Sequence, residues 1–243
     1  MPSIPLEKLF PIIHEDDDLL VINKPAGLVC HPTKTDEYSS LISRVRLYLG
    51  EDKAAHLVNR LDRETSGVTL VAKSDDVARE IRRLWENRSV DKEYLAIVHG
   101  HVREEKGLID APLGKDETSR VAVKDCVRPD GLASQTEFTV VRRFSRDEGD
   151  FTLLRIRLLT GRKHQIRIHL AHIGHPIVGD KIYGADEDMY LALVENRLTD
   201  EHRRRLIFRN QALHAARLRF LWHSRELDFQ CEPEEGFRVF VAS

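Results

Sequence analysis

Hydrophobic and polar positions follow a two-residue period, or form short apolar runs, over much of this chain. Both patterns are typical of β-strands. In the run at residues 151–159, Leu154, Ile156 and Leu158 should point inward and Arg155 and Arg157 outward, because successive side chains alternate across a strand. Strands are predicted on the same grounds at residues 19–23, 68–72, 92–98, 119–124, 133–144, 151–159, 212–221 and 227–230.

A helical period replaces the strand period in several other segments. Residues 36–49 carry an apolar face, and Gly50 is a suitable C-terminal stop. Residues 75–87 carry another, with arginines on the outer side. A third helix is predicted around residues 166–173, with Thr160 as N-cap and Gly174 at its end, and further helices near 187–197 and after Pro233. The apolar faces consist of Leu41, Ile42, Val45 and Leu49; Val77, Ala78, Ile81, Leu84 and Trp85; and Ile166, Leu170 and Ile173.

Strands outnumber helices, connections are short, and no linker-like stretch divides the 243 residues. The sequence therefore predicts one α+β domain over residues 1–243, with its core at about 15–230. We expect a mixed, largely antiparallel sheet in two joined lobes with flanking helices. A hydrophobic content of 41% supplies the apolar material for such a core.

Charge and cysteine content narrow the function classes. The formal net charge is −2, so any nucleic-acid partner must be held by local basic patches. Cys30, Cys126 and Cys231 are scattered, which argues against a disulfide framework and a zinc finger and fits a reducing, cytoplasmic location. We see neither a signal peptide nor an apolar run long enough to span a membrane.

Candidate chemistry begins with residues 59–67, where Asp62 lies between Arg60 and Arg63. Nearby cations favour an ionised carboxylate, which suits a nucleophile better than a general acid. A surface turn with an idle ion pair remains the alternative. The following residues 67–74 resemble a phosphate-binding P-loop, but Ala72 replaces its second glycine. A β-branched apolar run cannot wrap phosphates with its amides, so we reject an NTPase.

A second informative stretch covers residues 160–174. Free amides at a helix N-terminus, together with Arg162 and Lys163, make a natural phosphate site, and Arg167 lies one turn further along. Histidines at 164, 169, 172 and 175 raise the possibility of a metal site. Their spacing does not place three of them on one helix face, and no cysteine or carboxylate completes a set. We expect no metal.

Six motifs in order resemble the RluA family of RNA pseudouridine synthases. They are residues 19–32, 60–67 and 161–170, together with Lys92-Glu93-Tyr94, residues 174–184 and Leu213-His214-Ala215. The resemblance implies that uridine within an RNA, ribosomal or transfer, is isomerised to pseudouridine without cofactor or metal. We expect a monomer that needs no protein partner.

The resemblance also implies roles for individual residues. Asp62 would be the catalytic aspartate, acting as nucleophile at the ribose or the uracil ring, or as the base that removes a ribose proton. Tyr94 would stack on the extruded uracil and assist proton removal from C5, and Arg167 would pair with Asp62. Arg60 would fill the space left by the flipped nucleotide. The other RNA-binding residues implied are Arg63, Thr65, Arg162, Lys163, His164 and Gln165.

Two departures from the family pattern stand out. Asn59 occupies a position where many members carry histidine, so one RNA contact is expected to differ. The chain also starts almost directly at the catalytic domain, without room for an S4 RNA-binding domain. Substrate choice is then expected to come from the catalytic domain's own loops and helices.

Two alternatives stay open at this point. A non-catalytic RNA-binding protein on the same fold would not need Asp62, Tyr94 and Arg167, all of which are present. A hydrolase such as a glycosidase would need a second carboxylate, for which Glu64 is the only nearby candidate in the motif.

Overall fold

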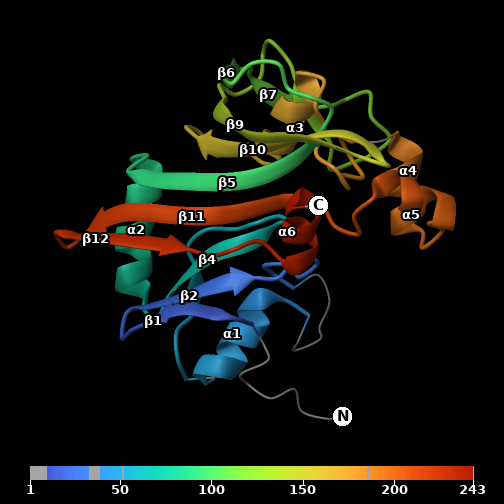
Figure 1. The fold of residues 1–243 in the computed structure, drawn as a ribbon. Helices are drawn as coiled ribbons and strands as arrows, with labels where there is room; N and C mark the ends of the chain where they lie inside the picture. The colour runs from blue at the N-terminus through green and yellow to red at the C-terminus, as the bar shows by residue number, and fades with distance from the viewer. Residues whose placement is uncertain (1–9, 33–38, 51, 185, 243) are drawn as a thin grey trace. The chain divides into compact units, whose positions relative to one another are not determined.

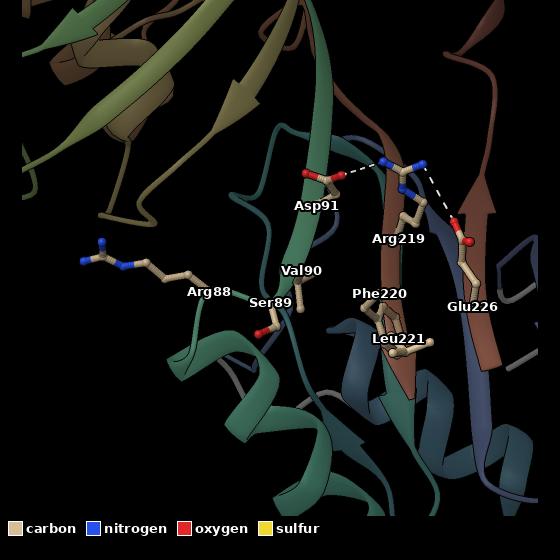
Figure 2. Close-up of a pocket in the computed structure, with 8 residues that line it drawn as sticks. All are labelled: Arg88, Ser89, Val90, Asp91, Arg219, Phe220, Leu221 and Glu226. Atoms are coloured by element: carbon tan, nitrogen blue, oxygen red, sulfur yellow. Dashed lines mark hydrogen bonds and ion pairs between the residues drawn. The ribbon is translucent and has the colours of Figure 1, made fainter. Parts of the chain in front are cut away.

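The computed structural model describes residues 10–32, 39–50, 52–184 and 186–242 (Figure 1). The chain forms two compact units. The N-terminal unit contains Met1–Lys92 and His214–Val239, and the central unit contains Glu93–Leu213 and Phe240–Ser243. Among the described residues, no helix has both the length and the apolar character needed to cross a membrane.

The N-terminal unit is built on strands in the order β1 (Ile12–Glu15), β2 (Leu19–Lys24), β4 (Ser66–Ala72) and β11 (Leu213–Trp222). β12 (Arg225–Gln230) pairs with β11, and β3 (His56–Leu57) pairs with β4. All pairs are antiparallel except β4 with β11, which run parallel. The β2–β4 and β4–β11 pairings lock the start of β4, directly after residues 59–65, into the middle of the sheet.

Helices cover both faces of this sheet. Leu19 and Val21 pack with α2 (Asp75–Glu86), whereas Leu20 and Ile22 pack with α1 (Leu41–Leu49). Because neighbouring residues of a strand face opposite sides, β2 must be apolar at consecutive positions. The predicted helix stop at Gly50 is confirmed by its φ of 97° and its bond to the carbonyl of Arg46. α6 (Glu235–Ala242) closes the chain and passes from this unit into the central one.

The central unit contains an antiparallel sheet in the order β5 (Val90–His99), β10 (Gly149–Leu158), β9 (Gln135–Arg146) and β6 (Lys106–Asp110). A separate ribbon pairs β7 (Leu113–Lys115) with β8 (Asp125–Val127). Three helices follow, namely α3 (Gln165–His172), α4 (Glu187–Val194) and α5 (Asp200–Leu206). Leu154 and Ile156 of β10 are fully buried while Arg155 and Arg157 are exposed, as predicted.

The α+β prediction with a largely antiparallel sheet is confirmed. The predicted strands and helices are also confirmed, with shifted ends and with the exceptions given below. Residues 36–38 of the first predicted helix lie outside the described residues. The strand predicted at 119–124 is wrong: these residues form turns, and Ser119, Arg120 and Lys124 bind Glu187 of α4. Thr160 is not the N-cap of α3, because that helix begins after His164. Six described elements were not predicted, namely β1, β3, β6, β7, β8 and α5.

Candidate active site

The loop that carries Asp62 is held by a buried lysine. Lys24 is completely inaccessible to solvent, and its Nζ donates to the carbonyls of Pro25, Leu28 and Arg63 at 2.9, 2.8 and 3.2 Å. The amide of Gly27 donates to the same Arg63 carbonyl at 2.8 Å. One ammonium group therefore ties the turn after β2 to the loop of Asp62.

Two opposing effects act on the protonated form of Lys24: burial disfavours it, and nearby groups favour it. Burial lowers the pKa of Lys24 to about 8, and Cys30, Glu234 and Asp62 act in the opposite direction. Asp62 thus has a cation of the N-terminal unit near it that the sequence argument, centred on Arg60 and Arg63, overlooked. The signal was present in the sequence, since Lys24 sits at the end of an otherwise apolar strand.

The end of the loop is fixed to the sheet by side chains of β4 and β11. Ser66 Oγ and His214 Nδ1 are 2.8 Å apart, and His214 Nε2 lies 3.0 Å from the carbonyl of Cys231. Gly67 has a φ of 119°, and a Cβ at this position would lie 2.2 Å from the carbonyl oxygen of Ala215. Only glycine fits this close pairing of β4 with β11.

Asn59 anchors the beginning of the loop. Its Nδ2 donates to the carbonyl of Val68 at 3.1 Å, and its Oδ1 accepts the amide of Leu70 at 2.7 Å. The side chain of Asn59 thus pairs with backbone groups of β4, as a neighbouring strand would. The structure gives Asn59 this supporting role, whereas the sequence argument treated the position as an RNA contact.

The remaining predicted residues of the loop differ in exposure. Arg60 and Arg63 are exposed, Asp62 is half-buried and Thr65 is buried. Arg63 Nε donates to the carbonyl of Gly27 at 3.3 Å, and the amide of Thr65 donates to the carbonyl of Asp62 at 3.1 Å. The loop therefore presents Arg60 and Arg63 outward, while Thr65 belongs to its interior.

Arg167 of the central unit forms a buried, bidentate ion pair with Asp180. Its Nε donates to Oδ2 at 2.6 Å and its Nη2 to Oδ1 at 2.9 Å, and both side chains are almost inaccessible. The amides of Ile182 and Tyr183 also donate to Asp180 Oδ1. Burial alone would raise the pKa of the Asp180 carboxyl, but Arg167 and the two amides outweigh it and hold the pKa below its ordinary value.

Asp180 was missed as a partner of Arg167 because it lies in an irregular segment after α3, where spacing gives no guide. Its place in the motif at residues 174–184 was the available signal. The proposed pairing of Arg167 with Asp62 stays a prediction. Tyr94 is half-buried on β5, opposite Ile156 of β10.

The turn before α3 is organised by Gln165. This side chain is buried, its Oε1 accepts from Thr160 Oγ1 and the Arg162 amide, and its Nε2 donates to the carbonyl of Gln135 and to Thr136 Oγ1. Every polar atom of the Gln165 amide is engaged. Gln165 therefore shapes the turn, whereas the sequence analysis predicted that it binds RNA directly.

The basic residues of the turn directly precede Gln165. Arg162 is exposed, with its Nε 3.4 Å from the carbonyl of Ala133. Lys163 is half exposed and pairs with Asp125 of β8 at 2.8 Å. His164, at the N-cap position, has a left-handed φ of 55° and no side-chain bond to the helix. The structure thus brings Arg162, Lys163 and His164 together at one surface of the central unit.

Two of the other histidines near α3, His169 and His175, serve as internal hydrogen-bonding groups, whereas His172 is exposed. His169 is buried, with Nδ1 2.8 Å from Thr136 Oγ1 and Nε2 2.9 Å from the carbonyl of Ala111, and His175 Nδ1 lies 2.9 Å from the carbonyl of His99. Across the residues that the structure describes, no group of three or more histidines, cysteines or carboxylates is placed to hold a metal ion.

Comparison with known proteins places these residues in a family context. Residues 18–172 match the model of the RNA pseudouridylate synthase family. The chain is 36% identical over 220 residues to ribosomal large subunit pseudouridine synthase D of Haemophilus ducreyi, covering 89% of this chain and 63% of that protein. The corresponding protein of Zymomonas mobilis is 32% identical over 246 residues, with coverages of 98% and 72%.

Solved structures give the same result for the fold. Human RNA pseudouridylate synthase domain containing 1 has a TM-score of 0.73 and 26% identity, over 96% of this chain and 86% of that one. The chain spans a little under two thirds of the length of the first curated relative, 63%.

Proposed function

Because this chain belongs to the RNA pseudouridylate synthase family, we propose that it isomerises uridine to pseudouridine in ribosomal RNA, with Asp62 as the catalytic aspartate. The observation that carries the proposal is the position of Asp62. It lies inside the matched region, half-buried, on a loop fixed by Lys24, Asn59 and the pairing of β4 with β11. A reacting group on so constrained a loop can be held in one geometry.

The reaction exchanges one bond to the ribose for another. The bond from C1′ to N1 of uracil breaks, the base turns, a bond from C1′ to C5 forms, and the proton lost from C5 is balanced by one gained at N1. Asp62 would act at the ribose, at the uracil ring, or on a ribose proton, and all three roles need an ionised carboxylate facing the flipped nucleotide. No redox partner is needed, since reactant and product are isomers.

The other residues would prepare this step. A uridine in folded RNA is stacked, and extruding it costs a few kcal/mol. Arg60, exposed next to Asp62, would occupy the vacated space, and Tyr94 would receive the base and assist the removal of its C5 proton. Arg167, already oriented by Asp180, would pair with Asp62. Arg162, Lys163 and His164 would bind flanking phosphates.

The test is a site-resolved map of pseudouridine in ribosomal and transfer RNA from cells with and without this gene. We expect at least one ribosomal uridine to depend on the gene, and the signal to be lost with Asp62→Asn. Asp17→Asn is the matched control, because Asp17 is an exposed aspartate of the same unit. It should restore the signal fully.

Four results would contradict parts of the proposal. An Asp62→Asn protein with full activity would remove the assigned role of Asp62. Gene-dependent sites only in transfer RNA would change the substrate class. RNA that is bound without modification, or free uracil released from it, would indicate the RNA-binding and the hydrolase alternatives, respectively.

A further inference from the structure

Tyr183 of the central unit has no role in the function proposed above, yet it contacts several of the residues involved. Its ring centroid lies 5.1 Å from the guanidinium carbon of Arg167. Its Oη lies 2.9 Å from His164 Nδ1 and 3.2 Å from the amide nitrogen of Asp125. One side chain therefore touches α3, the turn before α3 and β8.

The Asp125 amide can only donate, so the oxygen of Tyr183 accepts from it. The direction of the bond to His164 depends on the imidazole tautomer. We assign the neutral tautomer with its proton on Nε2, in which Nδ1 accepts the hydroxyl proton of Tyr183. Burial raises the pKa of Tyr183 far above its ordinary value, so the hydroxyl keeps this proton throughout the physiological range.

The hydrogen bond from Tyr183 can stabilise the unusual backbone conformation of His164. A left-handed φ of 55° is uncommon for a residue with a side chain, and strain of this kind persists only when surrounding contacts hold it. The side chain of His164 makes no capping hydrogen bond to the amides of α3. The ring of Tyr183 meets the imidazole edge to face, with centroids 5.7 Å apart.

The same hydroxyl also orients β8. It fixes the amide of Asp125, and the Asp125 carboxylate holds Lys163 at 2.8 Å. His164 is thus fixed directly and Lys163 through Asp125. The face of the Tyr183 ring packs against the guanidinium group of Arg167, and Asp180 accepts hydrogen bonds from Nε and Nη2 of the same guanidinium.

We propose that Tyr183 is a positioning residue with two separable parts: its hydroxyl orders the RNA-binding turn at Lys163 and His164, and its ring orients Arg167. The inference rests on the proposed function, which assigns RNA binding to the turn and a role near the reacting nucleotide to Arg167. It predicts that hydroxyl and ring affect different kinetic constants, because the turn binds RNA and Arg167 acts near the reacting nucleotide.

The experiment compares Tyr183→Phe, Tyr183→Leu and the control Tyr190→Phe on an unmodified transcript of large-subunit ribosomal RNA. Tyr190 is a half-buried tyrosine of α4 in the same unit. Tyr183→Phe should raise KM about fivefold, the factor for one lost hydrogen bond, with kcat nearly unchanged. Tyr183→Leu should raise KM equally and also lower kcat up to about tenfold, because the cation–π contact is gone. Tyr190→Phe should match the wild type.

Two results would overturn the inference: an unchanged KM for Tyr183→Phe, or equal kcat values for the Phe and Leu variants. Nitrogen-15 spectra of the imidazole of His164, assigned with His164→Gln, test the contact without any activity. Nδ1 should show an accepted hydrogen bond in the wild type and lose it in Tyr183→Phe. A wild-type protein inactive on all RNA, but with this spectral change, would refute the proposed function and leave the contact established. An unchanged spectrum would refute the contact itself.

Discussion

Removal of Asp180 should destabilise the protein strongly, because it leaves the guanidinium of Arg167 buried without its bidentate partner. Asp180 accepts two hydrogen bonds from Arg167 and two from backbone amides, and it is fully buried. Breaking a buried ion pair costs about 3–5 kcal/mol, since the remaining charge stays desolvated. Asp180→Ala should therefore lower the free energy of unfolding by about 3–5 kcal/mol.

Asp180→Asn should cost less, about 2–3 kcal/mol. Oδ1 accepts three of the four hydrogen bonds, and an asparagine oxygen can keep them. The new amide group instead faces the Nε of Arg167, which places donor against donor. Oδ2 of the native carboxylate accepts that bond at 2.6 Å.

Urea titrations followed by far-ultraviolet circular dichroism measure both values. Asp188→Ala is the matched control, because Asp188 forms an exposed ion pair with Arg120 in the same unit. Its midpoint should stay near that of the wild type, since exposed ion pairs contribute little. A loss below about 1 kcal/mol for Asp180→Ala would refute the reasoning from burial.

Acidification offers an independent check on Asp180. Its folded pKa lies below its unfolded value, so the unfolded state takes up the proton first and acid favours unfolding. The stability that the carboxylate contributes is present above the unfolded pKa of about 4 and is lost as the pH falls through the folded pKa. The advantage of the wild type over Asp180→Asn should shrink in that range. A constant difference would mean that the carboxylate is not responsible.

Three further predictions concern the remaining site. The difference in unfolding free energy between the wild type and Lys24→Met should shift in favour of the wild type by on the order of 3 kcal/mol between pH 8 and about 10.4, because Lys24 loses its proton near pH 8 in the folded state and only near 10.4 in the unfolded state. Urea titrations measure this difference, and a value that stays constant with pH would contradict the lowered pKa of Lys24. Gly67→Ala should cost at least about 2 kcal/mol through the strained φ and the clash with Ala215, while Gly236→Ala, in open space on α6, should cost nothing by the same titration. Tyr94→Phe should retain RNA binding but slow turnover, and equal single-turnover rates would remove its hydroxyl from proton transfer.

The regular elements were predictable where burial sets the pattern. β2 and β4 are buried at nearly every position, and the apolar face of α2 covers one side of the same sheet, so the sequence shows an apolar run and a helical period. β6 and α5 were missed for the opposite reason. Both are mostly exposed, and their sequences carry little apolar periodicity.

Errors at the site came from polar contacts between segments distant in sequence. The alternation at 119–124 suggested a strand, but Glu187 draws Ser119 and Lys124 into a closed loop. Thr160 has the chemistry of an N-cap, yet its hydroxyl binds Gln165 and the helix starts later. The loop that carries Asp62 lies where the sequence predicted it. The role of Lys24 could not be predicted, because the three carbonyls that its ammonium group binds come together only in the folded chain.

The parallel pairing of β4 with β11 has a consequence for how the protein is made. Ser66 is translated 148 residues before its partner His214, and Glu234, which accepts the amide of Ala26 at 2.8 Å, follows later still. Nearly all of the central unit is translated in between. The loop of Asp62 therefore acquires its supports from β11 and Glu234 only after nearly all of the central unit has been translated. Until then, a nascent chain carries Asp62 on a loop that lacks these supports, so under the proposed function it should not yet modify RNA.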